Sequence, residues 1–182
     1  MARPIALITG ASSGIGERIA LRLASSGHDL VLVARRGDEL ARVAEEAASV
    51  GATCETIVAD LAHAEDVARV ETRILDEGRP IEIVVNNAGY GRFGKITELD
   101  GAGEANEIAV NVTALTLLSR AALVAMARRK RGGILNVASL ASFIPFPGFT
   151  TYAATKAYVR HFTLALHEEA RPFGVQIGRA HV

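Results

Sequence analysis

Short apolar runs alternate with longer segments of helical periodicity along the chain. The runs that suit strands buried on both faces are residues 4–8, 29–34, 54–58, 81–85 and 133–137. Apolar residues recur at helical spacing after the first run and over residues 38–50, 65–77, 102–127 and 151–170. This alternation predicts a single-domain α/β protein with a three-layer, doubly wound parallel sheet of the Rossmann type.

A glycine-rich turn lies between the first predicted strand and the first helix. Residues 9–16 read Thr-Gly-Ala-Ser-Ser-Gly-Ile-Gly. A buried strand, a glycine turn and a helix form half of a dinucleotide-binding unit, whose backbone amides bind a pyrophosphate. Gly10 is assigned to the tight turn, Gly14 to close approach of the phosphates and Gly16 to close helix packing. The predicted phosphate contacts are Gly10, Ser12, Ser13, Gly14, Ile15 and Gly16; an ordinary Gly/Ser loop is the alternative.

Composition narrows the classes of function. The 182 residues carry 20 basic and 20 acidic side chains and are 49% hydrophobic, which favours one domain with a sizeable core. The balanced charge gives no reason to expect a nucleic acid or an anionic membrane as partner. The basic run at residues 128–131 follows a long helical pattern, so we interpret it as cations at a helix C-terminus.

The cysteine and histidine content and the length of the apolar runs bear on cellular location and on metal binding. Cys54 is the only cysteine and cannot form an internal disulfide, which is compatible with a reducing cytoplasm. No apolar run approaches the ~18 residues of a membrane span, and the first strand leaves no room for a signal peptide. The histidines show no metal-ligand spacing, so no metal site is expected. We therefore predict a cytoplasmic protein.

Polar residues gather after the later strands. Asn86-Asn87-Ala88-Gly89 follows the fourth strand and Ser139 the fifth. Tyr152 and Lys156 are four residues apart on a predicted helix, so both project from one face. An ammonium at that spacing favours the phenolate form of a tyrosine, which acid/base chemistry near neutral pH requires. Each feature alone has a plainer explanation: an Asn-rich turn, a capping serine, a core tyrosine with a solvated lysine.

The motifs TGxxxGIG, NNAG and YxxxK, in this order and each at its expected strand or helix, resemble the short-chain dehydrogenase/reductase family. The resemblance covers residues 4 to about 175. It implies hydride transfer between NADP(H) and a carbonyl or alcohol carbon, with Tyr152 as acid in reduction and base in oxidation. It also implies that Lys156 promotes ionisation of Tyr152 and binds the nicotinamide ribose, Ser139 orients the carbonyl and Asn111 holds a relay water.

The end of the second strand selects the cofactor. In an NAD-binding protein an acidic residue at this position accepts a hydrogen bond from the ribose 2′-hydroxyl, whereas the 2′-phosphate of NADP requires cations there. This chain has Arg35 and Arg36 at that position. We predict NADP(H), with Arg35 as the principal contact and Arg36 as the secondary one; a solvated pair in a turn is the alternative. The resemblance adds Asp60 at the adenine, although a turn or cap role explains that aspartate equally well. The remaining predicted cofactor contacts are Leu61, Asn87, Ala88, Gly89, Tyr152 and Lys156.

The loop after Ser139 is apolar. Residues 140–150 contain Phe143, Ile144, Pro145, Phe146, Pro147 and Phe149. We expect them to form one wall of the substrate pocket, with Phe93 as a further candidate, which favours a largely apolar ketone or aldehyde. The resemblance implies a homodimer or homotetramer, paired through the long helix and the Tyr-Lys helix.

The C-terminus departs from the family pattern. Residues 1–176 fit the NADP(H)-binding domain, but residues 177–182 read Ile-Gly-Arg-Ala-His-Val, with a glycine and a charge where a buried strand should follow. The hexapeptide resembles the translation of a widely used sequencing adapter. We expect it to be a non-native tail, with the last strand or strands missing, a sheet edge uncovered and little turnover.

Two other functions compete with an oxidoreductase. The first is a nucleotide-binding regulatory protein or non-catalytic remnant, which would keep the glycine loop but catalyse no reaction. The intact Ser139, Tyr152 and Lys156 argue against this alternative. A nucleotide-sugar epimerase or dehydratase of the extended relatives would usually show TGxxGxxG, which residues 9–16 lack.

Overall fold

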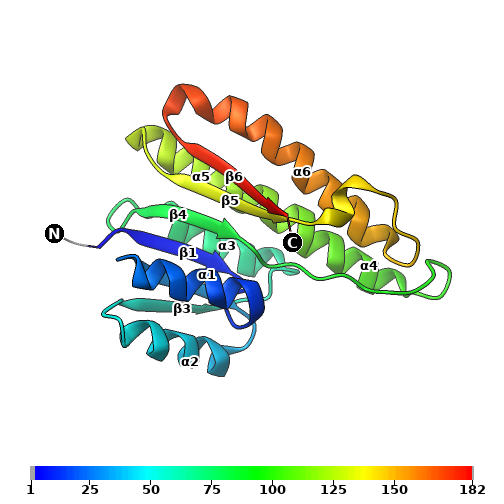
Figure 1. Ribbon diagram of the computed structural model, residues 1–182, viewed down its shortest axis with the longest axis horizontal. Helices are drawn as coiled ribbons and strands as arrows, with labels where there is room; N and C mark the ends of the chain where they lie inside the picture. Colours follow the sequence, from blue (N-terminus) through cyan, green and yellow to red (C-terminus); the bar gives the residue numbers. More distant parts are fainter. Residues whose placement is uncertain (1–2, 182) are drawn as a thin grey trace.

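The computed structural model describes residues 3–181, which form a six-stranded sheet with every pair of neighbouring strands parallel. The strand order is β3-β2-β1-β4-β5-β6, so the chain winds outward from β1 in both directions (Figure 1). This order confirms the predicted doubly wound fold and places the switch point between β1 and β4. The strands are β1 (Ile5–Thr9), β2 (Asp29–Ala34), β3 (Cys54–Val58), β4 (Ile81–Asn86), β5 (Gly133–Ala138) and β6 (Gln176–His181).

Helices pack on both faces because each carries one apolar stripe. Helices α1 (Gly14–Ser25) and α2 (Gly37–Ala48) share a buried cluster with β1 and β2 on one face. The other face is covered by α3 (Ala64–Ile74), α5 (Leu115–Arg129) and α6 (Thr150–Ala170). Two short 3₁₀ segments, η2 (Leu140–Phe143) and η3 (Arg171–Phe173), flank α6.

The long helix predicted over residues 102–127 is interrupted in its middle. Helix α4 (Gly101–Ile108) continues into a π-helical turn, η1 (Ala109–Ala114), before α5 begins. By length and composition the whole stretch Gly101–Arg129 could cross a membrane, contrary to the prediction that no segment approaches that test. Half of its most apolar window is buried in the fold, as expected of a core helix.

The C-terminal residues correct one prediction. Residues 177–181, which were expected to belong to a non-native tail in place of a strand, lie in β6, which pairs with β5 from Gln176 through His181. Ile177 is buried, whereas Gly178 and Arg179 are exposed at the sheet edge. Alternation along the strand accounts for Gly178, which lies on the opposite face from Ile177, but not for Arg179, which shares that face. A glycine and an arginine are tolerated at those exposed positions, because the backbone bonds to β5 and the buried Ile177 hold the strand.

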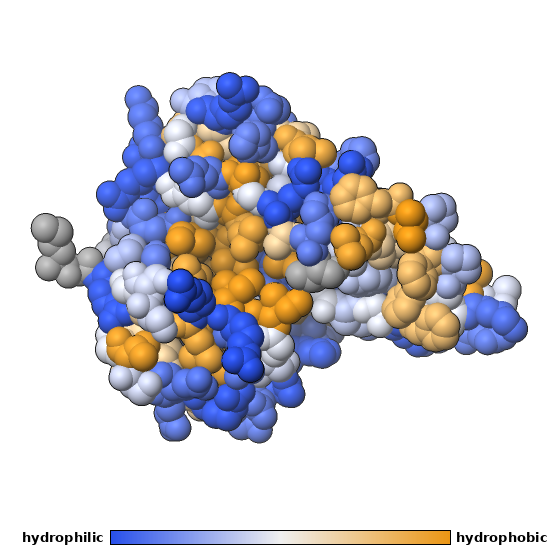
Figure 2. Space-filling view, in the orientation of Figure 1, coloured by the Kyte–Doolittle hydropathy of each residue, from blue (hydrophilic) through white to orange (hydrophobic). Residues whose placement is uncertain are grey.

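One face of β4 to β6 lacks a helix among the described residues. Figure 1 shows α1 and α2 on the near side beside β1 to β3, leaving β5 and β6 open to the viewer. A broad apolar area occupies this region in Figure 2. Ile83 of β4 and Leu135 of β5 pack against the cluster beneath α1 and α2 and are only partly buried. The predicted three layers are therefore complete over half of the sheet.

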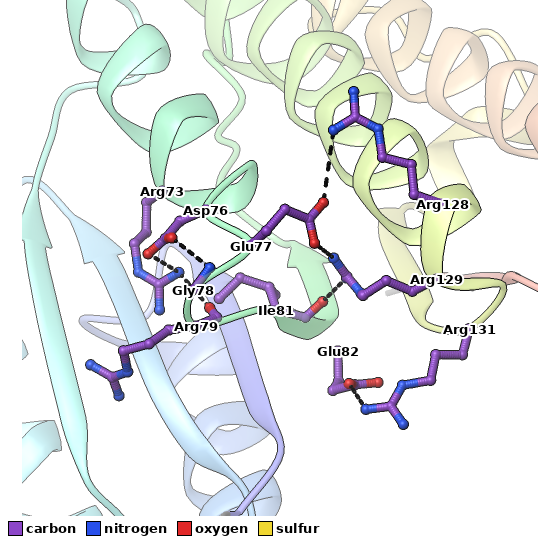
Figure 3. Close-up of polar contacts among 10 residues, drawn as sticks. All are labelled: Arg73, Asp76, Glu77, Gly78, Arg79, Ile81, Glu82, Arg128, Arg129 and Arg131. Carbon is purple, nitrogen blue, oxygen red and sulfur yellow. Dashed lines mark hydrogen bonds and ion pairs between the residues drawn. The ribbon is translucent and has the colours of Figure 1, made fainter.

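The basic run forms a polar anchor far from the strand C-termini. Arg129 donates to Glu77 at 3.1 Å and to the carbonyl of Ile81 at 2.8 Å (Figure 3). Arg131 pairs with Glu82, and Arg128 lies 3.9 Å from Glu77. Arg128 and Arg129 lie at the C-terminal end of α5, as predicted, and Arg131 follows two residues later. Together they tie this end of α5 to the loop before β4 and to the first residues of β4.

Candidate active site

A cleft lies at the carboxyl ends of the central strands. Its cavity of about 410 Å³ is bounded by the glycine loop, the segment after β4 and the start of α6. Predicted residues that line it are Gly10, Ser12, Ser13, Ile15, Arg35, Arg36, Asp60, Leu61, Asn87, Ala88, Gly89, Tyr152 and Lys156. Four predicted residues lie outside that lining: Gly14, Gly16, Asn111 and Ser139. The sequence motifs, far apart in the chain, thus meet around one space.

The glycine loop is fixed by contacts with the segment after β4. The side-chain amide of Asn87 donates to the carbonyls of Thr9 at 3.0 Å and Gly10 at 3.3 Å. The Thr9 hydroxyl accepts from the backbone amides of Asn87 and Ala88, both at 3.0 Å. A Cβ on Gly16 would lie 2.3 Å from the Gly10 carbonyl oxygen, so only glycine fits. The turn is therefore shaped before any ligand arrives.

Two arginines close one end of the cleft. Arg36 donates to the hydroxyl of Ser12 at 3.2 Å, which holds its guanidinium over the glycine loop. Arg35 is 70% exposed and lies 3.9 Å from the Asp60 carboxylate. Asp60 also accepts from the amide of Ala62, so it is both a turn residue and part of the lining. An anionic group placed here would meet two cations and one carboxylate.

Lys156 and Tyr152 lie at the opposite end. The Lys156 side chain is 4% exposed, and its ammonium donates to the carbonyl of Val137 at 2.8 Å. Burial lowers the pKa of Lys156 to about 8. The ammonium lies 5.7 Å from the centroid of the Tyr152 ring. At neutral pH Lys156 is still mostly charged, and that charge faces the ring.

Asn111 lies in the π-helical turn η1 and is buried. Its amide group accepts from the Tyr90 amide at 3.1 Å and donates to the Tyr90 carbonyl at 2.8 Å and to Thr155 at 3.1 Å. A Cβ on Gly89 would lie 2.9 Å from Asn111 Oδ1 and 3.4 Å from Lys156 Nζ. Asn111 and Lys156 are therefore neighbours across Gly89.

Ser139 lies immediately after β5 and is 7% exposed. Its hydroxyl oxygen accepts from the amide of Ala141 at 3.2 Å, which caps η2. The O–H remains available as a donor. The capping role named as the plainer alternative and a contact with a ligand oxygen are thus compatible.

The comparisons decide the family. The profile described as short chain dehydrogenase matches residues 4–181. This chain belongs to that family. A bulky-bulky ketone specific alcohol dehydrogenase from Comamonas testosteroni is 38% identical, with a TM-score of 0.95 over 100% of this chain and 73% of the other. A short-chain dehydrogenase from Sphingobium yanoikuyae in complex with NADPH is 38% identical, with a TM-score of 0.94 over 98% and 70%.

One further relative differs in length. The very-long-chain 3-oxoacyl-CoA reductase of Ajellomyces capsulatus is 35% identical over 181 residues, which is 94% of this chain and 52% of that protein. This chain therefore spans about half the length of that relative.

An aromatic cluster begins at Tyr152, and its other members lie outside the lining of the cleft. Phe149 lies with its ring centroid 5.7 Å from that of Tyr152, 5.2 Å from Phe93 and 5.6 Å from Phe146. Phe93 is 72% exposed and Phe146 is 44% exposed. Phe93 and the loop after Ser139, which the sequence analysis linked, lie together beside Tyr152.

Several residues in and around this cleft were not predicted from the sequence. Tyr90 and Val110 line it, and each is adjacent in sequence to a predicted residue. Thr9, whose hydroxyl accepts hydrogen bonds from the amides of Asn87 and Ala88, was predicted only as part of the glycine-rich motif. Glu107 lies one helical turn before Asn111 and is completely buried. Periodicity gives no signal for it, because an acidic residue in a helix is ordinarily solvated.

Proposed function

We propose that this chain is an NADP(H)-dependent oxidoreductase that interconverts a ketone or aldehyde and an alcohol on a largely apolar substrate. The observation that carries the proposal is one cleft that joins an anion-binding loop, a pair of arginines and a buried lysine beside a tyrosine. A single extended dinucleotide would then place its pyrophosphate at the glycine loop, its 2′-phosphate at the arginines and its nicotinamide beside the lysine and the tyrosine.

The cleft fits a dinucleotide phosphate in its chemistry. The N-terminus of α1 and the turn before it offer backbone amides to a pyrophosphate. Arg35 and Arg36 supply the cations that a 2′-phosphate requires. The Sphingobium relative was solved with NADPH, and a metagenomic relative at 36% identity was solved with NADP.

When bound, NADPH supplies a hydride from its nicotinamide ring. Tyr152 donates its phenolic proton to the substrate oxygen during reduction and takes a proton back during oxidation. In the complex, the Lys156 ammonium would stabilise the phenolate and hold the nicotinamide ribose, and the Ser139 hydroxyl would hold the substrate oxygen. Asn111, which neighbours Lys156 across Gly89, retains the water that returns protons to this pair.

The substrate side favours bulky apolar carbonyl compounds. The rings of Phe93, Phe146 and Phe149 form a continuous apolar wall that begins at Tyr152. Aromatic walls favour ligands that bury apolar surface against them. The Comamonas relative is specific for bulky-bulky ketones and the Ajellomyces relative is a reductase of very-long-chain 3-oxoacyl-CoA, and both names fit such a wall.

Assembly and location belong to the same proposal. Exposed apolar side chains on the long helix and on α6, Ile108, Val124, Tyr158 and Leu164, favour pairing of two copies through these helices. Light scattering would measure the mass; a monomer at micromolar concentration would contradict it. A cytoplasmic location, inferred from the single cysteine, is tested by cell fractionation.

The test of activity is NADPH oxidation by the purified chain. Enzyme is used in excess over NADPH, so that slow turnover is visible, with a panel of aryl ketones, 3-oxoacyl thioesters and short polar aldehydes. The proposal predicts oxidation with bulky apolar carbonyls, faster with NADPH than with NADH. Absence of NADPH binding would contradict it.

A further inference from the structure

Glu107 is a buried carboxyl group that the mechanism above does not use. Its side chain is 0% exposed on α4, one helical turn before Asn111. Oε2 accepts from the backbone amide of Arg92 at 3.0 Å, and Oε1 is buried without a hydrogen-bond partner among the described residues. A carboxyl group is costly at such a position unless it holds something in place.

The segment that Glu107 holds is the loop after the NNAG motif. Asn111 binds both backbone groups of Tyr90, and Glu107 binds the amide of Arg92 two residues further on. Since Glu107 and Asn111 are four residues apart on one helical stretch, they grip the loop from the same side.

The other side of this loop faces the proposed catalytic tyrosine. A Cβ on Gly91 would lie 2.7 Å from Cδ2 of Tyr152, so the backbone of Gly91 is in contact with the ring. Gly91 lies between Tyr90 and Arg92, the two residues that α4 and η1 hold. A shift of the loop would therefore move the ring.

A second acidic residue ties the same three segments together. Glu104 is paired with the Arg92 guanidinium at 3.4 Å and accepts a hydrogen bond from the Thr151 hydroxyl. Asp100 binds the same guanidinium at 2.6 Å. Thr151 directly precedes Tyr152 on α6. The loop is thus held at its backbone by Glu107 and at its side chain by Asp100 and Glu104.

We propose that Glu107 is a positioning residue for Tyr152, acting through the Gly91–Arg92 backbone that its carboxyl group holds against the phenol ring. This inference rests on the proposed function for its kinetic consequence. The position of the ring is independent of turnover, so it provides a separate readout.

The experiment compares Glu107→Met with Glu107→Gln in protein labelled with 3-fluorotyrosine. The chain has three tyrosines, Tyr90, Tyr152 and Tyr158, so three ¹⁹F resonances are assigned by Tyr→Phe replacements. Glu107→Met fills the space but removes the acceptor, whereas Glu107→Gln keeps it. Glu98→Met, at a glutamate whose side chain is 63% exposed, is the matched control.

Glu107→Met is expected to shift or broaden the Tyr152 resonance and leave that of exposed Tyr158 unchanged. The rate of NADPH oxidation should fall about tenfold at unchanged NADPH affinity, as misplacement of a reacting group causes. Glu107→Gln should restore both signals. The melting temperature of Glu107→Met should change little, because removing a costly buried carboxyl group offsets the loss of one hydrogen bond from the Arg92 amide.

An unchanged Tyr152 resonance in Glu107→Met would overturn the proposal, whatever the kinetics. The proposal would also be overturned if Glu107→Met lowered the melting temperature, weakened NADPH binding and disturbed all three tyrosine resonances together. Glu107 would then only support the fold. If the wild-type chain oxidises no NADPH with any carbonyl, the proposed function fails, and the resonance still decides the role of Glu107.

Discussion

The ammonium of Lys156 donates a 2.8 Å hydrogen bond to the carbonyl of Val137, in a position where the side chain is almost completely buried. Burial lowers the pKa of Lys156 to about 8, from an ordinary value of 10.5. The charge that the proposed chemistry needs is therefore held at a cost to the fold.

That cost gives a prediction for Lys156→Met. Charging the folded-state lysine below pH 8 costs about 3 kcal/mol at 1.36 kcal/mol per pKa unit. The lost bond to Val137 has a charged donor and offsets about 2 kcal/mol of the gain from removing the charge. Lys156→Met should raise the free energy of unfolding by about 1 kcal/mol at pH 7 while it abolishes NADPH oxidation.

The sign of the pH dependence follows from the lowered pKa. Between about pH 8 and 10.5 the unfolded chain binds more protons at Lys156 than the folded chain, so wild-type stability rises with pH. The advantage of the methionine variant should therefore shrink between pH 7 and pH 10 in urea unfolding. A variant less stable than wild type at pH 7 would contradict this account.

Asn87 is expected to preorganise the glycine loop. Asn87→Ala removes its bonds to Thr9 and Gly10 and should cost about 1–2 kcal/mol of stability. The NADPH dissociation constant should rise about tenfold, because the loop must then be ordered on binding. Fluorescence titration measures it, with Asn106→Ala at an exposed position as the control. If Asn87→Ala and Asn106→Ala bound NADPH equally well, Asn87 would not preorganise the glycine loop for binding.

Arg35 is predicted to recognise the 2′-phosphate. A lost charge-assisted bond of about 1.5–3 kcal/mol corresponds to roughly 10- to 100-fold weaker NADPH binding in Arg35→Ala, with NADH binding unchanged. Arg79→Ala, at an exposed arginine outside the cleft lining, is the matched control. If NADPH and NADH weaken equally, Arg35 does not read the phosphate, and Arg36 becomes the residue to test.

Gly91 is predicted to set the plane of the Tyr152 ring. Gly91→Ala would place a methyl group 2.7 Å from Tyr152 Cδ2 and displace the ring. The rate of NADPH oxidation should fall about tenfold or more, with cofactor affinity retained. Gly101→Ala meets no atom within 4 Å and serves as the control. Full activity in Gly91→Ala would show that the ring has room to move.

The sheet and its ligand-binding end could be predicted from sequence because short apolar runs and glycine turns are local signals. The bounds of β2 and β3 agree with the sequence prediction to the residue. The π-helical turn at Ala109–Ala114 could not be predicted, since it changes the backbone register without changing the apolar spacing. The contact between Gly91 and Tyr152 depends on segments 61 positions apart, which no local pattern encodes.

The C-terminal strand shows the limit of residue patterns at an edge. A glycine and an arginine at positions 178 and 179 predict a poor buried strand, yet the backbone of β6 pairs with β5 in full register. An edge strand pairs with a neighbour on one side only and is more exposed than β1 or β4. It therefore tolerates glycine and charged side chains that a central strand would not.

The central claim is that Tyr152 is the acid/base of a carbonyl reduction in this cleft. The most direct measurement is the rate of NADPH oxidation by Tyr152→Phe with the best ketone of the panel, alongside its NADPH dissociation constant. Tyr158→Phe, on the same helix but 41% exposed, is the matched control. The account predicts loss of at least about 10²-fold in rate for Tyr152→Phe with unchanged NADPH binding, and wild-type behaviour for Tyr158→Phe. An undiminished rate in Tyr152→Phe would contradict it.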